Sequence, residues 1–273
     1  MLEQTQLVTL TVILYTASLV MILRRSPTRQ LYAQTDHDQR HYLLIASLAL
    51  VAHGFSLLRI VFIDAGINFG FYITLSMVLF VVVAVFLLSA FSKPVDKIAL
   101  LVFPAAAISL LLTWIFPEQS HILSHVPIGM QIHILTSILA FSILSIAAVQ
   151  AILVALQEHQ LRAHQPNRFM RSLPPLQVME QFLFEMIGAG FLLLTISLMT
   201  GLIFVHDLFV QHLVHKTILS ISAWLIFGLL LFGKLFYGWR GKIAIRWTLI
   251  GFITLLLAYF GSKMVLELIL DRV

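Results

Sequence analysis

Apolar residues run along this chain in eight long stretches that are separated by short polar segments. About 20 residues of apolar helix are needed to cross a hydrocarbon core of about 30 Å. Inside lipid the backbone polar groups must be paired within the protein, so continuous apolar stretches of this length favour helices over a β-barrel. The pattern predicts an all-α fold, a polytopic membrane helix bundle with eight transmembrane helices at about 5–23, 42–62, 71–91, 98–116, 128–156, 182–205, 216–237 and 247–269.

The composition supports a membrane protein. Of the 273 residues, 60% are hydrophobic and only 11% are charged, whereas a soluble domain of this length exposes far more charge. The chain contains no cysteine, which excludes disulfides, thiolate metal sites and haem attachment through thiols of its own. We expect a single transmembrane domain over residues 1–273.

Lysine and arginine lie almost entirely in alternate loops. The loops after the first, third, fifth and seventh stretches contain them, and the opposite loops contain almost none. Because cytoplasmic loops of membrane proteins are enriched in these residues, both termini are predicted to lie outside. The net charge of +5 is spread over these loops, so it predicts contact with the lipid bilayer and no nucleic-acid partner.

Two histidines fall inside predicted helices, both in the half of the bilayer that the topology places outside. They are His53 in VAHGFSL and His133 in MQIHILTS. An ionisable residue inside a span is a candidate for function, and two neutral imidazoles on facing helices can ligate haem iron from both sides. The alternative is that each ring only forms hydrogen bonds with a neighbouring carbonyl or hydroxyl group.

A short histidine-rich segment, VHDLFVQHLVHKT, joins the sixth and seventh predicted helices. It contains His206 and His215, which are either interfacial residues or contacts for a ligand. The segment itself either covers a flat hydrophobic ligand or is an ordinary connector. Arg59, near the outer end of the second helix, extends to the membrane interface, pairs with Asp64, or contacts a propionate or phosphate group.

Three segments, Ile128–Glu158, Leu173–Phe204 and His215–Leu270, resemble the cytochrome c assembly superfamily of membrane haem-handling proteins. The similarity is greatest to its YpjD-type inner-membrane branch, with the HemX-type proteins nearby. The resemblance implies a multi-pass protein of the bacterial inner membrane with a haem b cofactor. Two of the axial histidines of the family match His133 and His53, which are the expected iron ligands. The candidate haem-binding residues are therefore His133, His53, His215, His206 and Arg59.

The sequence also departs from the family pattern. Haem-exporting members have a tryptophan-rich motif between the sixth and seventh helices, and only Lys216 and Trp224 of it are present here. The other two axial positions fall at Phe232 and near Leu270. We therefore predict a haem-binding or haem-handling membrane protein that is not an enzyme and not a complete cytochrome c synthase. The alternative is a structural or regulatory protein that kept the scaffold without haem and acts with another inner-membrane protein.

Overall fold

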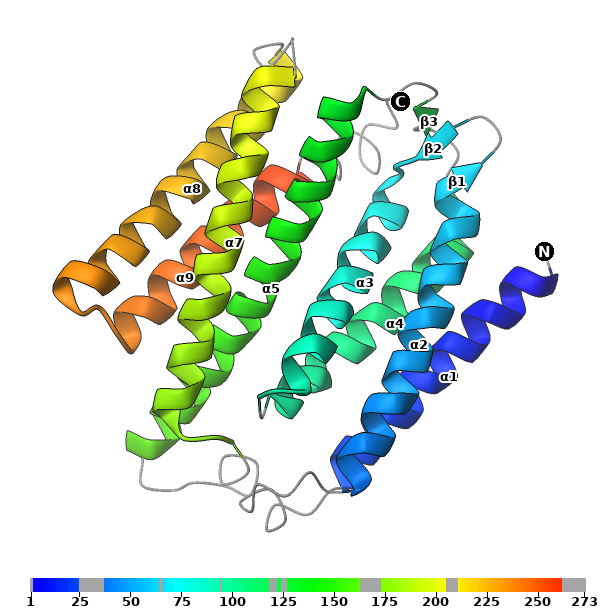
Figure 1. Ribbon diagram of the computed structural model, residues 1–273, viewed down its shortest axis with the longest axis horizontal. Coiled ribbons are helices and arrows are strands. Elements are labelled where there is room, and N and C mark those ends of the chain that lie inside the picture. The colour runs from blue at the N-terminus through cyan, green and yellow to red at the C-terminus, as the bar shows by residue number, and fades with distance from the viewer. Residues whose placement is uncertain are drawn as a thin grey trace. The chain divides into compact units, whose positions relative to one another are not determined.

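The computed structural model describes residues 2–24, 37–63, 66–93, 95–117, 122–123, 127–162, 173–204 and 211–261. The chain forms two compact units. Unit 1 comprises Met1–Ser124 with His159–Pro174, and unit 2 comprises His125–Glu158 with Pro175–Val273. Each unit has its own set of packed helices (Figure 1). The expectation of one domain over 1–273 stays a prediction.

Eight helices in the described part of the chain are long and apolar enough to cross a membrane. They are α1 (Leu2–Arg24), α2 (His37–Val61), α3 (Phe71–Ala90), α4 (Ala99–Ile115), α5 (Ile128–Arg162), α7 (Leu176–Phe204), α8 (Gln211–Tyr237) and α9 (Lys242–Leu256). A 3-10 turn, Asp96–Ile98, precedes α4, and a π-helical turn, Leu257–Gly261, follows α9. These turns complete the membrane-spanning lengths Asp96–Ile115 and Lys242–Gly261. The predicted eight-helix membrane fold is confirmed, whereas the orientation of the termini stays a prediction.

Two helices extend well beyond the apolar stretches that predicted them. Helix α5 ends at Arg162 rather than near 156, and α7 begins at Leu176 rather than at 182. The added turns carry polar residues such as Gln157 and Glu180. Hydropathy locates the part of a helix that matches the hydrocarbon core, so it does not report turns that continue past that core. The predicted end of the last helix, near 269, lies outside the described residues.

A small antiparallel sheet follows α2 in unit 1. Strand β1 (Phe62–Ile63) pairs with β2 (Gly66–Asn68), with Phe62 opposite Ile67. Strand β3 (Ile122–Leu123) pairs with the other edge of β2, with Ile122 opposite Asn68. Strands of two or three residues are too short to show an alternating pattern, so the sequence did not indicate them. The fold class remains all-α.

The helices of unit 1 close into a four-helix bundle. Helix α1 packs against α2 and α4, and α3 packs against α2 and α4. Inside the bundle Tyr15 stacks on Phe103 with ring centroids 5.6 Å apart, and Phe86 meets Phe103 edge-on at 5.4 Å. All three side chains are buried. Helices in lipid associate through such close packing and through hydrogen bonds between helices.

In unit 2, α5 and α7 run antiparallel, with contacts from Gly129 and Phe204 to Gln150 and Met179. Leu144 of α5 packs over Gly190 of α7, and nearer the other end Gln150 donates from Nε2 to the carbonyl of Met179 at 3.0 Å. Helix α8 packs against both α7 and α9. Phe141 of α5 contacts the end of α9 and the π-helical turn through Phe252, Tyr259 and Phe260.

Candidate functional site

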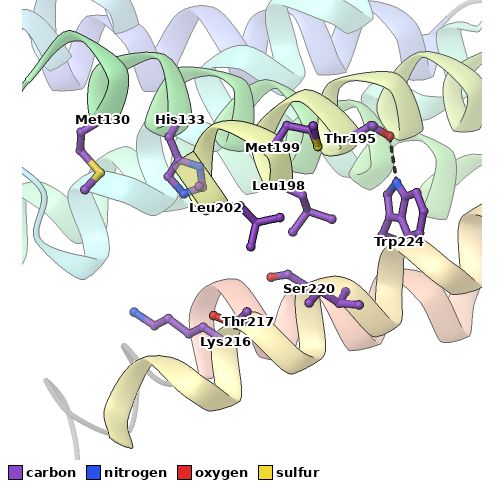
Figure 2. Close-up of a pocket in the computed structure, with 12 residues that line it drawn as sticks. Met130, His133, Thr195, Leu198, Met199, Leu202, Lys216, Thr217, Ser220 and Trp224 are labelled. Atoms are coloured by element: carbon purple, nitrogen blue, oxygen red, sulfur yellow. Dashed lines mark hydrogen bonds between the residues drawn. The ribbon is translucent and has the colours of Figure 1, made fainter. Parts of the chain in front are cut away.

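A cavity of about 520 Å³ lies within unit 2, and α5, α7 and α8 form its walls. The lining is mostly apolar and contains a few polar side chains. It consists of Met130, His133, Thr195, Leu198, Met199, Gly201, Leu202, Lys216, Thr217, Ser220, Ile221 and Trp224. Figure 2 shows the α8 residues Lys216 and Ser220 facing α5 and α7 across this space. An apolar cavity of several hundred Å³ with a few fixed polar groups is typical of cofactor and small-molecule sites.

His133 is the imidazole on the wall of this cavity. Its Nδ1 atom lies 2.8 Å from the backbone carbonyl oxygen of Ser197 on α7. A carbonyl oxygen only accepts hydrogen bonds, so Nδ1 carries the proton and donates it. In the neutral form of the ring, the lone pair is then on Nε2, for which the described part of the chain offers no hydrogen-bond partner. Iron- and zinc-ligating histidines commonly show this arrangement, with the second ring nitrogen bound to a carbonyl group.

A small hydrogen-bond network between α5 and α7 holds the carbonyl that fixes His133. The Ser197 carbonyl also accepts from the Thr200 hydroxyl at 3.0 Å. The Ser137 hydroxyl donates to the His133 carbonyl at 2.5 Å and lies 2.7 Å from the Ser197 hydroxyl. These bonds join the two helices at the level of the imidazole, so the position of the ring depends on both helices.

Gly201 provides the space that the imidazole occupies. A Cβ atom at this position would lie 2.9 Å from Cε1 and 3.1 Å from Nδ1 of His133. The ring therefore lies directly against the α7 backbone, one turn beyond the carbonyl that it binds. A larger residue at 201 would push the ring away from the Ser197 carbonyl.

The end of the cavity away from His133 is aromatic. The Trp224 indole donates from Nε1 to the Thr195 hydroxyl at 2.9 Å (Figure 2) and stacks on Phe191 with centroids 5.7 Å apart. An imidazole, an aromatic ring and a lysine thus surround an apolar space. Such a set of groups suits a flat apolar ligand that carries a metal and a carboxylate.

His53 has a different environment, inside unit 1. The side chain is fully buried. Its Nδ1 lies 3.2 Å from the Tyr15 hydroxyl of α1, and its Nε2 lies 2.9 Å from the Ser76 hydroxyl of α3. Both ring nitrogens therefore have hydroxyl partners, which is the hydrogen-bonding alternative raised from the sequence. A ligand role for His53 stays a prediction, as does a haem shared with His133, because the two histidines belong to different units.

The other candidate residues lie away from the cavity lining or outside the described residues. His215 is exposed on α8, one position before Lys216, and Arg59 is exposed near the end of α2. His206 is not among the described residues. Nor does the described part of the chain contain a group of three or more histidine, aspartate or glutamate side chains that could hold a metal ion.

Sequence reasoning did not identify Ser197, Met130 or Met199 as parts of the site. One signal was present for α7. Ser197 and Gly201 are small residues four positions apart, a spacing that places them on one helix face and allows another helix to approach closely. That pattern indicates where α7 meets a neighbour, but it does not tell which neighbour or which side chain fills the space.

Comparisons with known proteins agree with the resemblance seen in the sequence. The family model described as cytochrome C assembly protein matches residues 42–270. The inner membrane protein YpjD of Escherichia coli (strain K12) is 32% identical over 233 residues, which cover 85% of this chain and 88% of that protein. An uncharacterized 28.8 kDa protein of Azospirillum brasilense is 32% identical over 145 residues, 52% of this chain and 54% of its own length. No solved structure is significantly similar to the chain.

Proposed function

Because the chain belongs to the cytochrome c assembly family, we propose that it binds or handles haem at the cavity of unit 2. One observation carries the proposal. His133 lines the cavity with Nδ1 bound to the Ser197 carbonyl at 2.8 Å, which leaves the lone pair of Nε2 for iron. The absence of the tryptophan-rich motif from the sequence argues against a complete cytochrome c synthase.

The spanning helices and a similar protein together indicate the cellular location. Eight helices of the described chain can span a bilayer, and a relative of almost the same extent is an inner membrane protein of E. coli. The chain is therefore a multi-pass protein of the bacterial inner membrane, in contact with lipid. Haem binding, and an interaction with a protein that delivers or accepts haem, are what we propose.

The residues of the cavity fit a haem group. His133 would ligate the iron through Nε2, Leu198 and Leu202 would contact the apolar faces of the porphyrin, and Lys216 would pair with a propionate. Bound haem would supply an iron centre for electron transfer or for transfer of the haem itself. His53 could act as a second ligand only by giving up a hydrogen bond to Tyr15 or Ser76, so we assign the first iron ligand to His133.

A haem titration of the purified protein in detergent tests the proposal. We expect a Soret band that saturates at one haem per chain, and a loss of affinity of about 10-fold or more in His133→Ala, since loss of groups that support a metal ligand already costs about 10- to 100-fold. His159→Ala is the matched control, because His159 is an exposed histidine of the same helix outside the cavity lining, and it should bind like the wild type. No Soret band in the wild type would contradict haem binding.

A second candidate function is a structural or regulatory membrane protein that kept the scaffold without the cofactor. The hydroxyl partners on both nitrogens of His53 favour it, because they account for this buried histidine in the unit 1 bundle without a ligand. If the protein has this function, it should co-purify with another inner-membrane protein, and the amount of that protein should be the same for the wild type and for His133→Ala. Loss of that association in His133→Ala would contradict it.

A further inference from the structure

The turn that joins α8 to α9 in unit 2 has a defined conformation. Gly238 and Gly241 adopt positive φ angles of 65° and 54°, a backbone region that favours glycine. Between them, Trp239 donates its backbone N–H to the carbonyl of Gly233 at 3.1 Å, and its indole stacks on Trp247 with centroids 5.9 Å apart. The turn therefore folds back on the two helices and holds the next residue, Arg240, in a set position.

A buried carboxylate orients the Arg240 side chain. Glu180 of α7 accepts the backbone N–H of Gly241 at 2.9 Å and the Nε of Arg240 at 3.4 Å. The Arg240 side chain is nevertheless 55% exposed, and Nε is the one guanidinium nitrogen with a bond to another described residue. Glu180 thus fixes one edge of the guanidinium and leaves the two terminal nitrogens open to a ligand. Two parallel N–H groups of an arginine match the oxygens of a phosphate group.

Three further basic residues lie within six positions of Arg240 in the chain. Lys242 and Arg246 are exposed on α9 and lie four positions apart, which places them on one helix face. Neither has an ion pair within the described residues. Lys234, in the last turn of α8, lies with Nζ 4.5 Å from the centre of the Phe184 ring. Glu158 and Glu180 have oxygens within 4 Å of the Cβ position of Gly241, and Glu185 follows Phe184 in α7, so the four basic residues outnumber these three carboxylates.

Large apolar side chains lie next to the cations. Phe236 is 69% exposed, Tyr237 72% and Ile243 44%. At the end of a membrane helix, aromatic and basic residues together mark the level of the lipid headgroups. The chain thus offers cations for a headgroup and apolar residues for acyl chains at the same place.

From this arrangement we infer that the α8–α9 turn is a binding site for an anionic phospholipid. The phosphate contacts Arg240, Lys242 and Arg246, and the acyl chains lie along Phe236 and Ile243. Basic pockets between membrane helices recognise anionic headgroups in this way. A zwitterionic lipid fits less well, because its own cation would lie among four protein cations. Free phosphate lacks the acyl chains that the exposed apolar residues contact.

Quenching of tryptophan fluorescence by brominated lipids tests the inference, because Trp239 and Trp247 lie at the turn. The full-length protein is reconstituted into phosphatidylcholine vesicles that contain a small, equal fraction of either brominated phosphatidylglycerol or brominated phosphatidylcholine. We expect stronger quenching by the anionic lipid. Removing one basic residue at a membrane surface weakens lipid binding by roughly 5-fold, so the triple variant Arg240→Gln, Lys242→Gln and Arg246→Gln should lose the preference.

Three further variants separate the effect of this turn from effects of total charge and of misfolding. The triple variant Arg24→Gln, Arg40→Gln and Lys93→Gln removes the same charge from unit 1 and should keep the preference. Lys242→Gln with Arg246→Gln leaves the Glu180 contacts in place and should reduce the preference even if loss of Arg240 disturbs the fold. Arg240→Lys keeps the charge but not the paired N–H groups and should give an intermediate value.

The inference would be overturned by equal quenching from the two brominated lipids in the wild type. Equal loss of the preference in the unit 1 control variant would overturn it as well, because the effect would then follow total charge and not this turn. Relief of the quenching by millimolar inorganic phosphate would assign the site to free phosphate instead of a lipid.

Discussion

His133 and His53 show two ways in which a membrane helix accommodates an imidazole. The ring of His133 uses one nitrogen to bind a backbone carbonyl and keeps the other on a cavity wall. The ring of His53 has a hydroxyl partner at each nitrogen and no exposed surface. The difference depends on single neighbouring residues, so substitutions at those neighbours separate a ligand-binding histidine from a structural one.

Gly201→Ala should displace the His133 ring. The added methyl group would lie 2.9 Å from Cε1 of the imidazole, and overpacking of this kind costs about 1–3 kcal/mol. Thermal unfolding in detergent, followed by circular dichroism, should show a lower Tm. Gly188→Ala on the same helix is the control, because no atom lies within 4 Å of its Cβ position. Alanine also has a higher helix propensity than glycine, by up to about 1 kcal/mol, which stabilises the helix in both variants. Equal Tm values for the two variants would contradict the close contact at Gly201.

Tyr15→Phe should destabilise unit 1 through His53. Phenylalanine keeps the stacking on Phe103 but leaves Nδ1 of the buried histidine without a partner, which costs about 1–3 kcal/mol. Chemical unfolding in mixed micelles measures the loss. Thr16→Val removes an exposed hydroxyl that bonds only within α1, and its effect should stay within about 0.5 kcal/mol. If Tyr15→Phe were as mild as Thr16→Val, the buried network would have no structural role.

At the element scale, hydropathy predicted the helices well and their partners not at all. The apolar stretch at 71–91 corresponds to α3 almost residue for residue, because lipid exposure demands continuous apolar sequence. The contact of Trp224 with Thr195 joins α8 to α7 across 29 positions, and a single sequence contains no signal for such a pair. The last turns of α5 and the first turns of α7 were not predicted either, because they are polar and lie beyond the apolar stretches.

The Trp224–Thr195 hydrogen bond should contribute measurably to the packing of α7 against α8. A double-mutant cycle with Trp224→Phe and Thr195→Val is expected to give a coupling energy of about 0.5–1.5 kcal/mol, the usual range for a hydrogen bond within a protein. Trp114 and Thr5 form the matched pair in unit 1, exposed and longer at 3.2 Å. Their coupling should be smaller. A larger coupling for the exposed pair would contradict the importance of the bond at the cavity.

At the scale of the whole molecule, the alternation of basic loops predicts which ends of the helices face the cytoplasm. Because the sequence contains no cysteine, single cysteines can be labelled without background. Ser92→Cys, in the turn after α3, should be protected from a membrane-impermeant maleimide in intact spheroplasts, and Pro117→Cys, after α4, should react. The reverse pattern would place both termini inside and contradict the predicted orientation.

The candidate site could be predicted only in part. Its central histidine was recognisable, because His133 is an ionisable residue inside an apolar stretch. Its tautomer could not be predicted, because that depends on a carbonyl of α7 that lies 64 positions along the chain. The methionines and leucines of the cavity wall look like ordinary membrane-helix residues in the sequence. Their place on the lining depends on how three helices pack.

Imidazole rescue of His133→Ala tests whether His133 ligates haem iron, because added imidazole replaces only the missing ring. The purified variant is titrated with haem, with and without added imidazole, and the Soret band is recorded beside that of His53→Ala. We expect His133→Ala to bind haem weakly alone and to regain a wild-type Soret band with imidazole, while His53→Ala needs no rescue. Wild-type haem binding by His133→Ala without imidazole would contradict iron ligation by His133, and no haem binding by the wild type would contradict a haem site.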